Sequence, residues 1–253
     1  MELTTVAPDE VTVHDGTTVH RHVGLEPATA YRFDGLDATT LPRPKGELLG
    51  TFATVNDVHF GETEAGLIDG QGEAFSVPPG STPYPTLMNT DAVAEIAELD
   101  PVAVLVKGDL TTDGSAEQLA EFEATYRPTF GDRLHFIRGN HESYHHVEVG
   151  PSYERVELPG ALAIMLDTSR DGHPNGDLSA EQLERLDDEA ADSDVPVLVF
   201  GHHQIWLPDE DQRTDRFFGI LPDASEALQA LIARRLNVRG YFAGHTHRNR
   251  RRV

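Results

Sequence analysis

The segment VRGYFAGHTHRN, residues 238–249, contains the pattern around which the rest of this chain can be understood. An apolar run reaches Gly244, and two histidines, His245 and His247, follow two positions apart. A short apolar run of this kind is typical of a buried strand. Because residues i and i+2 of an extended backbone project to the same side, the segment predicts a strand that ends by directing two imidazoles toward one point.

Metal-ligating residue types follow four other apolar runs in the same way. Asp57 and His59 follow FATV, Asp109 follows VLVK, Asn140 and His141 follow HFIR, and His202 follows VLVF. In open α/β sheets, ligands bind at the carboxyl ends of the strands, so we expect the five strand ends to meet at one site. A single His-x-His pair arises readily by chance among 13 histidines, but five ligand-bearing strand ends do not.

The donor types in this set indicate transition metals. Carboxylate, amide oxygen and imidazole together suit Mn²⁺, Fe²⁺ or Zn²⁺, whereas Ca²⁺ and Mg²⁺ favour sites made of oxygen alone. The chain has no cysteine, which excludes disulfides and thiolate sites. The candidate ligands are Asp57, His59, Asp109, Asn140, His202, His245 and His247. This set is too large for one tetrahedral zinc and suits two divalent metal ions that share a carboxylate.

Two features of the backbone are expected to aim these side chains. Where two candidate ligands lie two positions apart, as after the first and the last of the five runs, an extended backbone would make them a pincer. A glycine stands directly before four of the candidate ligands: Asp109, Asn140, His202 and His245. Because glycine has an unrestricted φ, we expect these glycines to let the chain turn tightly out of each strand.

Charge and composition narrow the class of partner. Lys and Arg number 20 against 43 Asp and Glu, which gives a formal net charge of −23. This charge repels a nucleic-acid backbone and an anionic membrane, so neither is an expected partner. Residues 1–10 lack the basic and apolar regions of a secretion signal, and no apolar stretch approaches the roughly 20 residues of a membrane span. We therefore expect a soluble cytoplasmic protein, with its oligomeric state left open.

The chain divides into two parts by its pattern. Residues 1–47 alternate apolar and polar side chains around Asp15-Gly16, which predicts a hairpin within a short β-rich extension. Over residues 48–253, apolar runs alternate with helical patterns, which predicts a layered α/β domain with sheets inside and helices outside. The expected strands are 48–55, 102–108, 134–139, 161–167, 195–201 and 239–244.

Helix starts can be located from their capping residues. The stretch SAEQL occurs twice, and both Ser115 with Gln118 and Ser179 with Gln182 match the capping-box pattern. Two more helices are expected around residues 93–97 and 228–232, where apolar residues recur at helical spacing.

Two long segments look like loops, 61–89 and 204–223. Loops of this length are usually functional or disordered. The second contains the only tryptophan, Trp206, which could stack on a substrate base or cover the core, and we favour the core. His203 is expected to point away from His202 and either to support the ligands from behind or to be structural.

With these motifs in place, the chain resembles the calcineurin-like metallophosphoesterases over residues 48–249. The motifs that carry the resemblance are D-x-H at 57–59, GD at 108–109, GNH at 139–141, GH at 201–202 and GHxH at 244–247. The resemblance implies a metallophosphoesterase sandwich with two metals. One metal would be held by Asp57, His59 and His247, the other by Asn140, His202 and His245, with Asp109 bridging. His141 would lie beside the phosphate, as transition-state stabiliser or proton donor.

The resemblance also implies a reaction. Two cations about 3.5–4 Å apart generate a hydroxide between them, which attacks a small phosphoester substrate. The stretch GDLTTDGSAEQLAEF and the GHTHR motif are similar to the class III cyclic-nucleotide phosphodiesterases, although GHHQIW replaces their usual HHPP. Purple acid phosphatases have glycine at the position of His59 and tyrosine at that of Thr112, so a tyrosinate-iron site is not expected. Alternatives are a phosphomonoesterase and a catalytically idle metal-binding or protein-interaction module.

The sequence also leads to expectations about the N-terminal extension and the C-terminus. Residues 24–37 resemble the closing strands of the fibronectin-III-like modules that precede some phosphatase domains, so the extension could be a remnant of one. The chain stops six residues after His247, where family members usually continue with further strands. We therefore expect a truncated C-terminus or a shortened second sheet.

Overall fold

The structure is a computed structural model of the 253-residue chain. It describes residues 1–16, 18–33, 35–65, 75–209, 211–247 and 251. None of the helices within these ranges has the length and apolar character that crossing a bilayer requires. The chain forms two compact units, of which the first covers Met1–Leu48 and the second begins at Leu49.

The first unit consists of short antiparallel strands. Strands β1 (Glu2–Val6), β2 (Glu10–Asp15) and β3 (Thr18–Val23) form one sheet, and β4 (Ala30–Phe33) pairs with β5 (Leu36–Thr39). The predicted hairpin is present, since Asp15 pairs with Thr18 across the turn. A small core of Val11, Val13 and Ala38 holds the unit together. Its relation to a fibronectin-III-like module stays a prediction.

The second unit contains two main sheets. In the first, β6 (Ala53–Val55), β9 (Val104–Lys107) and β10 (Leu134–Ile137) run parallel, with β9 in the middle. In the second, β11 (Tyr153–Leu158) is antiparallel to β12 (Ala161–Leu166), which continues in parallel to β13 (Val197–Gly201) and β14 (Val238–Phe242). A two-stranded ladder joins β7 (Glu64–Ala65) and β8 (Phe75–Ser76).

Five helices and a 3₁₀ turn surround these sheets in the described part of the chain. They are α1 (Tyr84–Glu98), α2 (Ala116–Phe130), the turn η1 (Gly131–Arg133), α3 (Asn140–Tyr144), α4 (Ala180–Asp192) and α5 (Pro222–Arg234). Segment 61–89 was expected to be a loop throughout, but α1 begins within it at Tyr84. Pro83 and Pro85 explain this start, because the first turn of a helix needs no proline N–H.

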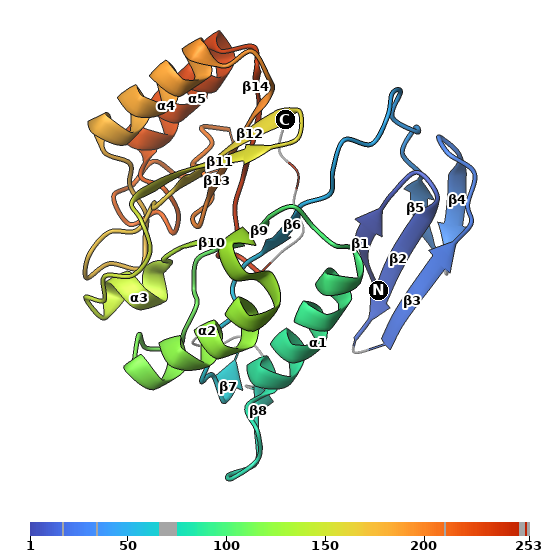
Figure 1. Cartoon of the computed structure of the whole chain (residues 1–253), viewed down its shortest axis with the longest axis horizontal. Coiled ribbons are helices and arrows are strands. Elements are labelled where there is room, and N and C mark those ends of the chain that lie inside the picture. The colour runs from blue at the N-terminus through green and yellow to red at the C-terminus, as the bar shows by residue number, and fades with distance from the viewer. Residues whose placement is uncertain (17, 34, 66–74, 210, 248–250, 252–253) are drawn as a thin grey trace. The chain divides into compact units, whose positions relative to one another are not determined.

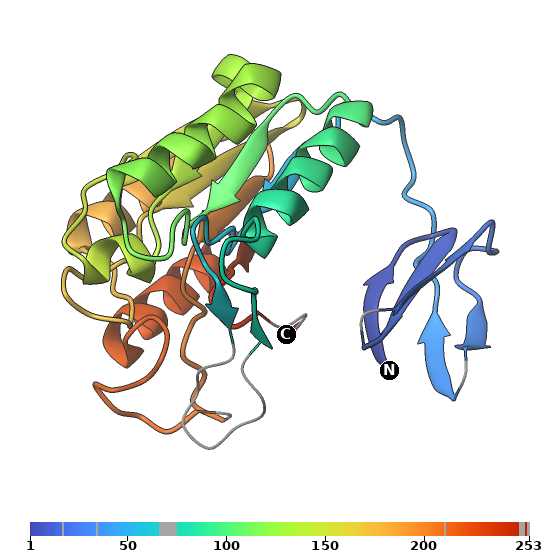
Figure 2. The ribbon, with the colours of Figure 1, turned by 90° about the horizontal axis from the view of Figure 1, so that it is seen from below.

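Alternation along β9 shows how the first sheet is covered. Val104 and Val106 project to one side, where they pack with Phe122 and Tyr126 of α2. Leu105 projects to the other side and joins an apolar cluster that includes residues of the second sheet. Helices α1 and α2 lie side by side (Figures 1 and 2) and cover the first of these faces.

The second sheet is covered in the same way. Ile164 of β12 and Val199 of β13 pack with Leu186 of α4 and Leu228 of α5. Phe200 of β13 projects to the opposite face and meets the first sheet. The layers therefore run helix, sheet, sheet, helix, with α1 and α2 on one side and α4 and α5 on the other (Figure 1). Each buried aliphatic or aromatic side chain contributes roughly 1.5–3 kcal/mol, so these three apolar layers hold the sandwich together. The predicted layered α/β fold is confirmed.

Candidate metal centre

The residues that follow β6, β9, β10, β13 and β14 gather in one place. Three of these strands belong to the first sheet and two to the second. Among the described residues, overlapping groups of His and Asp side chains have ligand atoms within 4.8 Å of one another. Asn140 joins them through its contact with His202. Asp57, His59, Asp109, Asn140, His141, His202, His245 and His247 are called the ligand cluster below.

One end of the ligand cluster is formed by Asp57, His59 and His247. Nε2 of His59 lies 3.2 Å from Nε2 of His247, and the latter lies 3.4 Å from Oδ1 of Asp57. Ligand atoms bonded at 2.0–2.1 Å to one tetrahedral ion are about 3.3 Å apart, because the edge of a tetrahedron is about 1.6 times its central bond. The spacing of these three side chains therefore suits a shared metal ion.

The other end contains Asn140, His202 and His245. Nε2 of His202 lies 2.9 Å from Oδ1 of Asn140 and 3.2 Å from Oδ2 of Asp109. Nε2 of His245 is buried and has no hydrogen-bond partner among the described residues. A buried polar atom without a partner is costly, and a metal ion would satisfy it.

Asp109 lies between the two ends. Its Oδ2 is 3.2 Å from Nε2 of His202, 3.8 Å from Nε2 of His59 and 3.9 Å from Nε2 of His141. One carboxylate oxygen thus approaches imidazoles from both ends, and this geometry suits a ligand that two ions share.

The backbone aims these side chains differently from the expected pincer. Asp57, His59, Asp109, His245 and His247 all have positive φ, between 47° and 70°. They lie beyond the ends of their strands, since β6 stops at Val55 and β14 at Phe242. The side chains converge through left-handed turns, which are costly for residues with a Cβ and cluster at functional sites.

The glycines of the motifs also act differently from what was expected. Only Gly108 has a positive φ, of 86°, among the four that precede candidate ligands. Gly139 has a φ of −111°, which any residue can adopt, but a Cβ there would lie 2.1 Å from Oδ1 of Asp109. The expectation of unrestricted φ is therefore wrong for Gly139, where glycine is required by close approach to a candidate ligand.

Charges within the ligand cluster oppose the effect of burial. Burial alone would raise the pKa of Asp109, yet the neighbouring imidazoles, His202 first, hold that pKa well below its ordinary value. Burial disfavours the imidazolium of His202, but the carboxylate of Asp109 raises the pKa of His202 to about 9. Burial and the charge of His202 lower the pKa of His245 to about 3. His202 therefore favours the imidazolium form at neutral pH, and His245 favours the neutral imidazole.

Hydrogen bonds orient two of the imidazoles. Nδ1 of His202 donates to the carbonyl of Lys107 at 2.8 Å, which turns Nε2 toward Asp109. Nδ1 of His141 donates to the carbonyl of Thr112 at 2.7 Å, and the backbone N–H of His141 donates to Oδ1 of Asp109. Such bonds to the second ring nitrogen fix the tautomer, as they do around metal-bound histidines.

Comparison with known proteins identifies the family. The profile of the calcineurin-like phosphoesterases matches residues 50–249, which is most of the chain. The chain belongs to the calcineurin-like phosphoesterase family. The family predicted from the five motifs is confirmed.

Relatives and structural neighbours of this phosphoesterase are consistent with that assignment. A probable cyclic nucleotide phosphodiesterase of Rhodococcus erythropolis is 27% identical over 221 residues, which are 81% of this chain and 66% of that protein. The chain thus spans slightly less than two thirds of the relative's length, and the match supports the resemblance to the cyclic-nucleotide branch.

Two solved structures share the fold. A dimetal phosphatase from Danio rerio has a TM-score of 0.60 at 19% identity, with 79% of this chain and 82% of that one covered. A purple acid phosphatase from yellow lupin, Lupinus luteus, has a TM-score of 0.53 at 17% identity, with 90% and 46% covered. At these identities the likeness concerns the fold alone.

Glu142 is a site residue of the phosphoesterase that sequence reasoning missed. Its carboxylate is fully buried and accepts hydrogen bonds from the backbone N–H and the hydroxyl of Thr111 and from the N–H of Gly139. It thereby ties the turn after Asp109 to the turn that carries Asn140. The available signal was the position of Glu142 directly after the GNH motif. Its partner, Thr111, lies 31 residues away in the sequence, so a local pattern does not reveal the contact.

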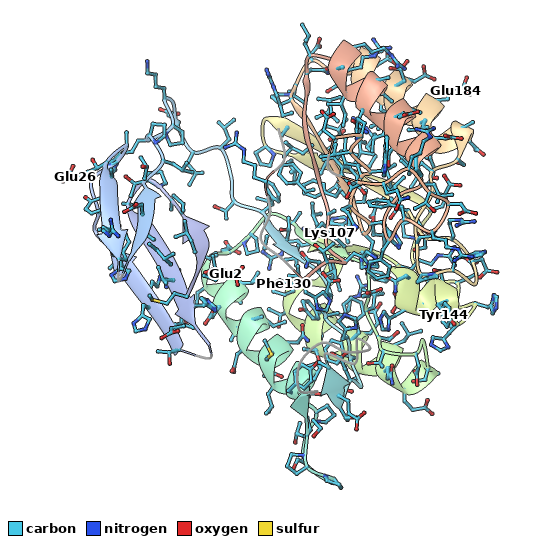
Figure 3. The ribbon with its side chains drawn as sticks, turned by 180° about the vertical axis from the view of Figure 1, so that it is seen from behind. Glu2, Glu26, Lys107, Phe130, Tyr144 and Glu184 are labelled. Carbon is cyan, nitrogen blue, oxygen red and sulfur yellow. The ribbon has the colours of Figure 1, made fainter. Side chains whose placement is uncertain are left out.

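His203 and Lys107 also lie near the ligand cluster. The ring of His203 is 4.6 Å from that of His245 and 4.8 Å from that of His202, so the expectation that it points away from His202 is wrong, while its supporting or structural role stays a prediction. Its Nδ1 contacts the hydroxyl of Thr168 at 2.8 Å. Lys107 is only 5% exposed, in the interior of the second unit (Figure 3). Burial lowers the pKa of Lys107 to about 8, although the nearby Asp57 acts in the opposite direction.

Proposed function

We propose that this phosphoesterase is a dinuclear metal-dependent phosphodiesterase of the cytoplasm that hydrolyses small phosphodiesters, with cyclic nucleotides as the leading candidates. The observation that carries the proposal is the position of Asp109, whose Oδ2 approaches imidazoles of both ends of the ligand cluster. A carboxylate between two sets of nitrogen and oxygen donors is the arrangement that two-metal hydrolysis requires.

The residues present fit two transition-metal ions. Asp57, His59 and His247 would hold one ion, and Asn140, His202 and His245 would hold the other, with Asp109 shared. The mixed nitrogen and oxygen donors favour Mn²⁺, Fe²⁺ or Zn²⁺. When bound, two such ions supply Lewis acidity toward the phosphoryl oxygens and acidify a water molecule.

His141 is proposed as the proton donor to the leaving oxygen. The hydrogen bond from Nδ1 to the Thr112 carbonyl fixes the ring, which leaves Nε2 as the nitrogen for proton transfer. Its side chain is 33% exposed, which leaves room for a substrate beside it. A positioned acid of this kind accelerates a reaction by about 10²- to 10⁴-fold.

Two observations favour a small diester as the substrate. The relative from Rhodococcus erythropolis is named a probable cyclic nucleotide phosphodiesterase. The formal charge of −23 opposes the approach of a long polyanion such as a nucleic acid, whereas a small ester carries little charge.

A substrate panel tests this proposal on protein loaded separately with Mn²⁺, Fe²⁺ or Zn²⁺. We expect turnover of bis(4-nitrophenyl) phosphate and of cyclic AMP, with slower turnover of 4-nitrophenyl phosphate. Turnover of the monoester alone would contradict a phosphodiesterase. No turnover of any ester by fully loaded protein would favour the idle metal-binding module.

Metal analysis of variants tests the assignment of ligands. We expect about two ions per chain and a loss of metal in Asp109→Ala and His245→Ala. His141→Ala should keep its metal and lose about 10²- to 10⁴-fold in turnover. Asp113→Ala is the matched control, because Asp113 accepts a hydrogen bond from the N–H of Ser115 in the loop after Asp109. A full metal content in Asp109→Ala would refute the shared ligand.

A further inference from the structure

An exposed aromatic ring lies against the ligand cluster. The segment between β13 and α5 carries Phe218, whose ring centroid is 4.0 Å from that of His245 at an interplanar angle of 31°. Phe218 is 52% exposed, whereas Trp206 of the same segment is only 4% exposed. The tryptophan is therefore part of the core, as favoured from the sequence, and the aromatic surface that this segment offers beside the site belongs to Phe218.

The backbone around Phe218 is held in place. Its carbonyl accepts a hydrogen bond from Nε2 of Gln204, and the N–H of Ile220 donates to the carbonyl of Gln204 at 2.9 Å. The carbonyl of Gly219 accepts from the N–H of Gly176 at 2.8 Å. A Cβ on Gly219 would come within 2.6 Å of the carbonyl oxygen of Gln204, so the backbone at Gly219 packs directly against the backbone at Gln204. Single exposed apolar side chains are common on proteins. Phe218 differs because hydrogen bonds on both sides fix the backbone that carries it.

The solvent-accessible side of the ligand cluster indicates where a substrate enters. The side chains of Asp57, His59, Asp109 and His202 are at most 6% exposed, whereas that of His247 is 57% exposed. His141 is also partly exposed. A phosphoryl group bound at the cluster must keep its ester substituent on this open side. Phe218, exposed and in contact with His245, provides an aromatic face at the edge of the cluster.

We propose that Phe218 selects phosphoesters with a flat aromatic substituent, such as a nucleobase or an aryl group, by stacking on it. The inference rests on the proposed function, because it requires a phosphoryl group at the ligand cluster. Stacked aromatic pairs gain energy beyond the burial of apolar area, so an aromatic substituent should be preferred to an aliphatic one of similar size.

Binding of phosphonates tests this inference without any turnover, because their carbon–phosphorus bond is not hydrolysed. The affinities of phenylphosphonate and cyclohexylphosphonate are measured by calorimetry on the full chain loaded with Mn²⁺. We expect phenylphosphonate to bind roughly threefold to tenfold more tightly. This preference should disappear in Phe218→Leu, which keeps an apolar side chain, and should survive in Phe218→Trp.

The matched control is Leu236→Ala, which removes an exposed apolar side chain that lies just before β14, at the opposite end of the strand from His245. It should keep the preference for the phenyl compound, and equal metal content and thermal midpoint in all variants would show that they are folded. A preference unchanged in Phe218→Leu would overturn the inference.

Kinetics separates failure of this inference from failure of the proposed function. If diesters are turned over and the phenyl preference does not depend on Phe218, the inference is wrong and the function stands. If no ester is turned over but the preference is lost in Phe218→Leu, the proposed reaction is wrong and the aromatic binding face stands.

Discussion

Asp109 and His202 form a buried pair of opposite charges in the ligand cluster. Both side chains are buried, and Oδ2 of Asp109 lies 3.2 Å from Nε2 of His202. Burial disfavours the imidazolium, but the carboxylate outweighs it and raises the pKa of His202 from an ordinary value of 6.5 to about 9. Since metals bind the deprotonated imidazole, an ion that enters here must displace this proton.

Metal affinity is therefore expected to increase with pH until about pH 9, where the imidazolium of His202 loses its proton even in the absence of metal. Displacement of one proton corresponds to roughly a tenfold gain in affinity per pH unit between pH 7 and pH 8. Titration calorimetry in two buffers with different ionisation enthalpies measures the number of protons released on Mn²⁺ binding. His146→Gln is the control, because His146 pairs with Asp171 on the surface. Affinity that stays constant over this range would contradict the coupling.

In the metal-free protein, the ion pair of His202 makes the free energy of unfolding fall as the pH rises, which is opposite to the trend in metal affinity. Because the folded pKa of His202 is raised, its ion pair contributes to the free energy of unfolding below pH 6.5, and that contribution is lost as the pH rises through about 9.

At the level of single residues, the sequence identified the ligand cluster but not its surroundings. The gathering of the candidate ligands could be predicted because each follows an apolar run, and their order along the chain is a local property. The positive φ of Asp57 and the close approach of Gly139 to Asp109 depend on contacts between distant segments. Phe218 was missed for the same reason, since no pattern in residues 204–223 indicates that it reaches His245.

The two helices that begin with SAEQL show how tertiary contacts change a local element. In α4, the hydroxyl of Ser179 accepts from the N–H of Gln182, and Oε1 of Gln182 accepts from the N–H of Ser179, so the predicted capping box is confirmed. In α2, the side chain of Ser115 makes no capping bond, so the prediction there is wrong. Oε1 of Gln118 instead accepts from the backbone N–H groups that follow Asp109.

Serine-to-alanine substitutions at the two starts should therefore differ. We expect Ser179→Ala to lower the free energy of unfolding by about 1 kcal/mol, because it removes a formed N-cap. Ser115→Ala should change it by no more than a few tenths of a kcal/mol. Urea denaturation of the two variants measures both values, and each variant serves as the control for the other. Equal losses would show that Ser115 caps α2 after all.

Among the strands, the predictable ones were those buried on both faces. The run 195–201 contains β13, and 161–167 contains β12. The edge strand β11 was missed, because its sequence, YERVEL, alternates buried and partly exposed residues and was overshadowed by the apolar runs around it. In the run 48–55, only Ala53–Val55 forms a strand. The first residues of the run are exposed and belong to neither sheet.

In the second unit, the sandwich brings candidate ligands from two sheets to one edge. The hydrogen bond from His202 to the carbonyl of Lys107 connects the end of β13 with the end of β9. The layered fold could be predicted because its apolar runs and helical faces are local patterns. The division of the strands between two sheets could not, because it depends on which runs pair.

The net charge of −23 leads to a prediction for the molecule as a whole. Repulsion among surface carboxylates opposes the compact state, and salt screens it by shortening the Debye length from about 10 Å at 0.1 M to about 3 Å at 1 M. We expect the thermal midpoint to rise between these concentrations of NaCl. Salt also weakens exposed ion pairs such as Arg127 with Glu123, but such pairs contribute little to stability.

Scanning calorimetry of the metal-free protein measures this change. KCl is the control, since an effect of ionic strength must be the same for both salts. A midpoint that falls with salt would show that surface ion pairs contribute more than the repulsion costs.

The left-handed backbone at Asp57, His59, Asp109, His245 and His247 has an evolutionary consequence. Each of these L-amino acids occupies a conformation that glycine or asparagine would tolerate better, at a cost of about 1 kcal/mol or more per position. Selection for heat resistance alone would therefore favour replacement of these five side chains, at the expense of the ligand cluster. The five positions together place this backbone cost at the ligand cluster, as expected of strain held at a functional site.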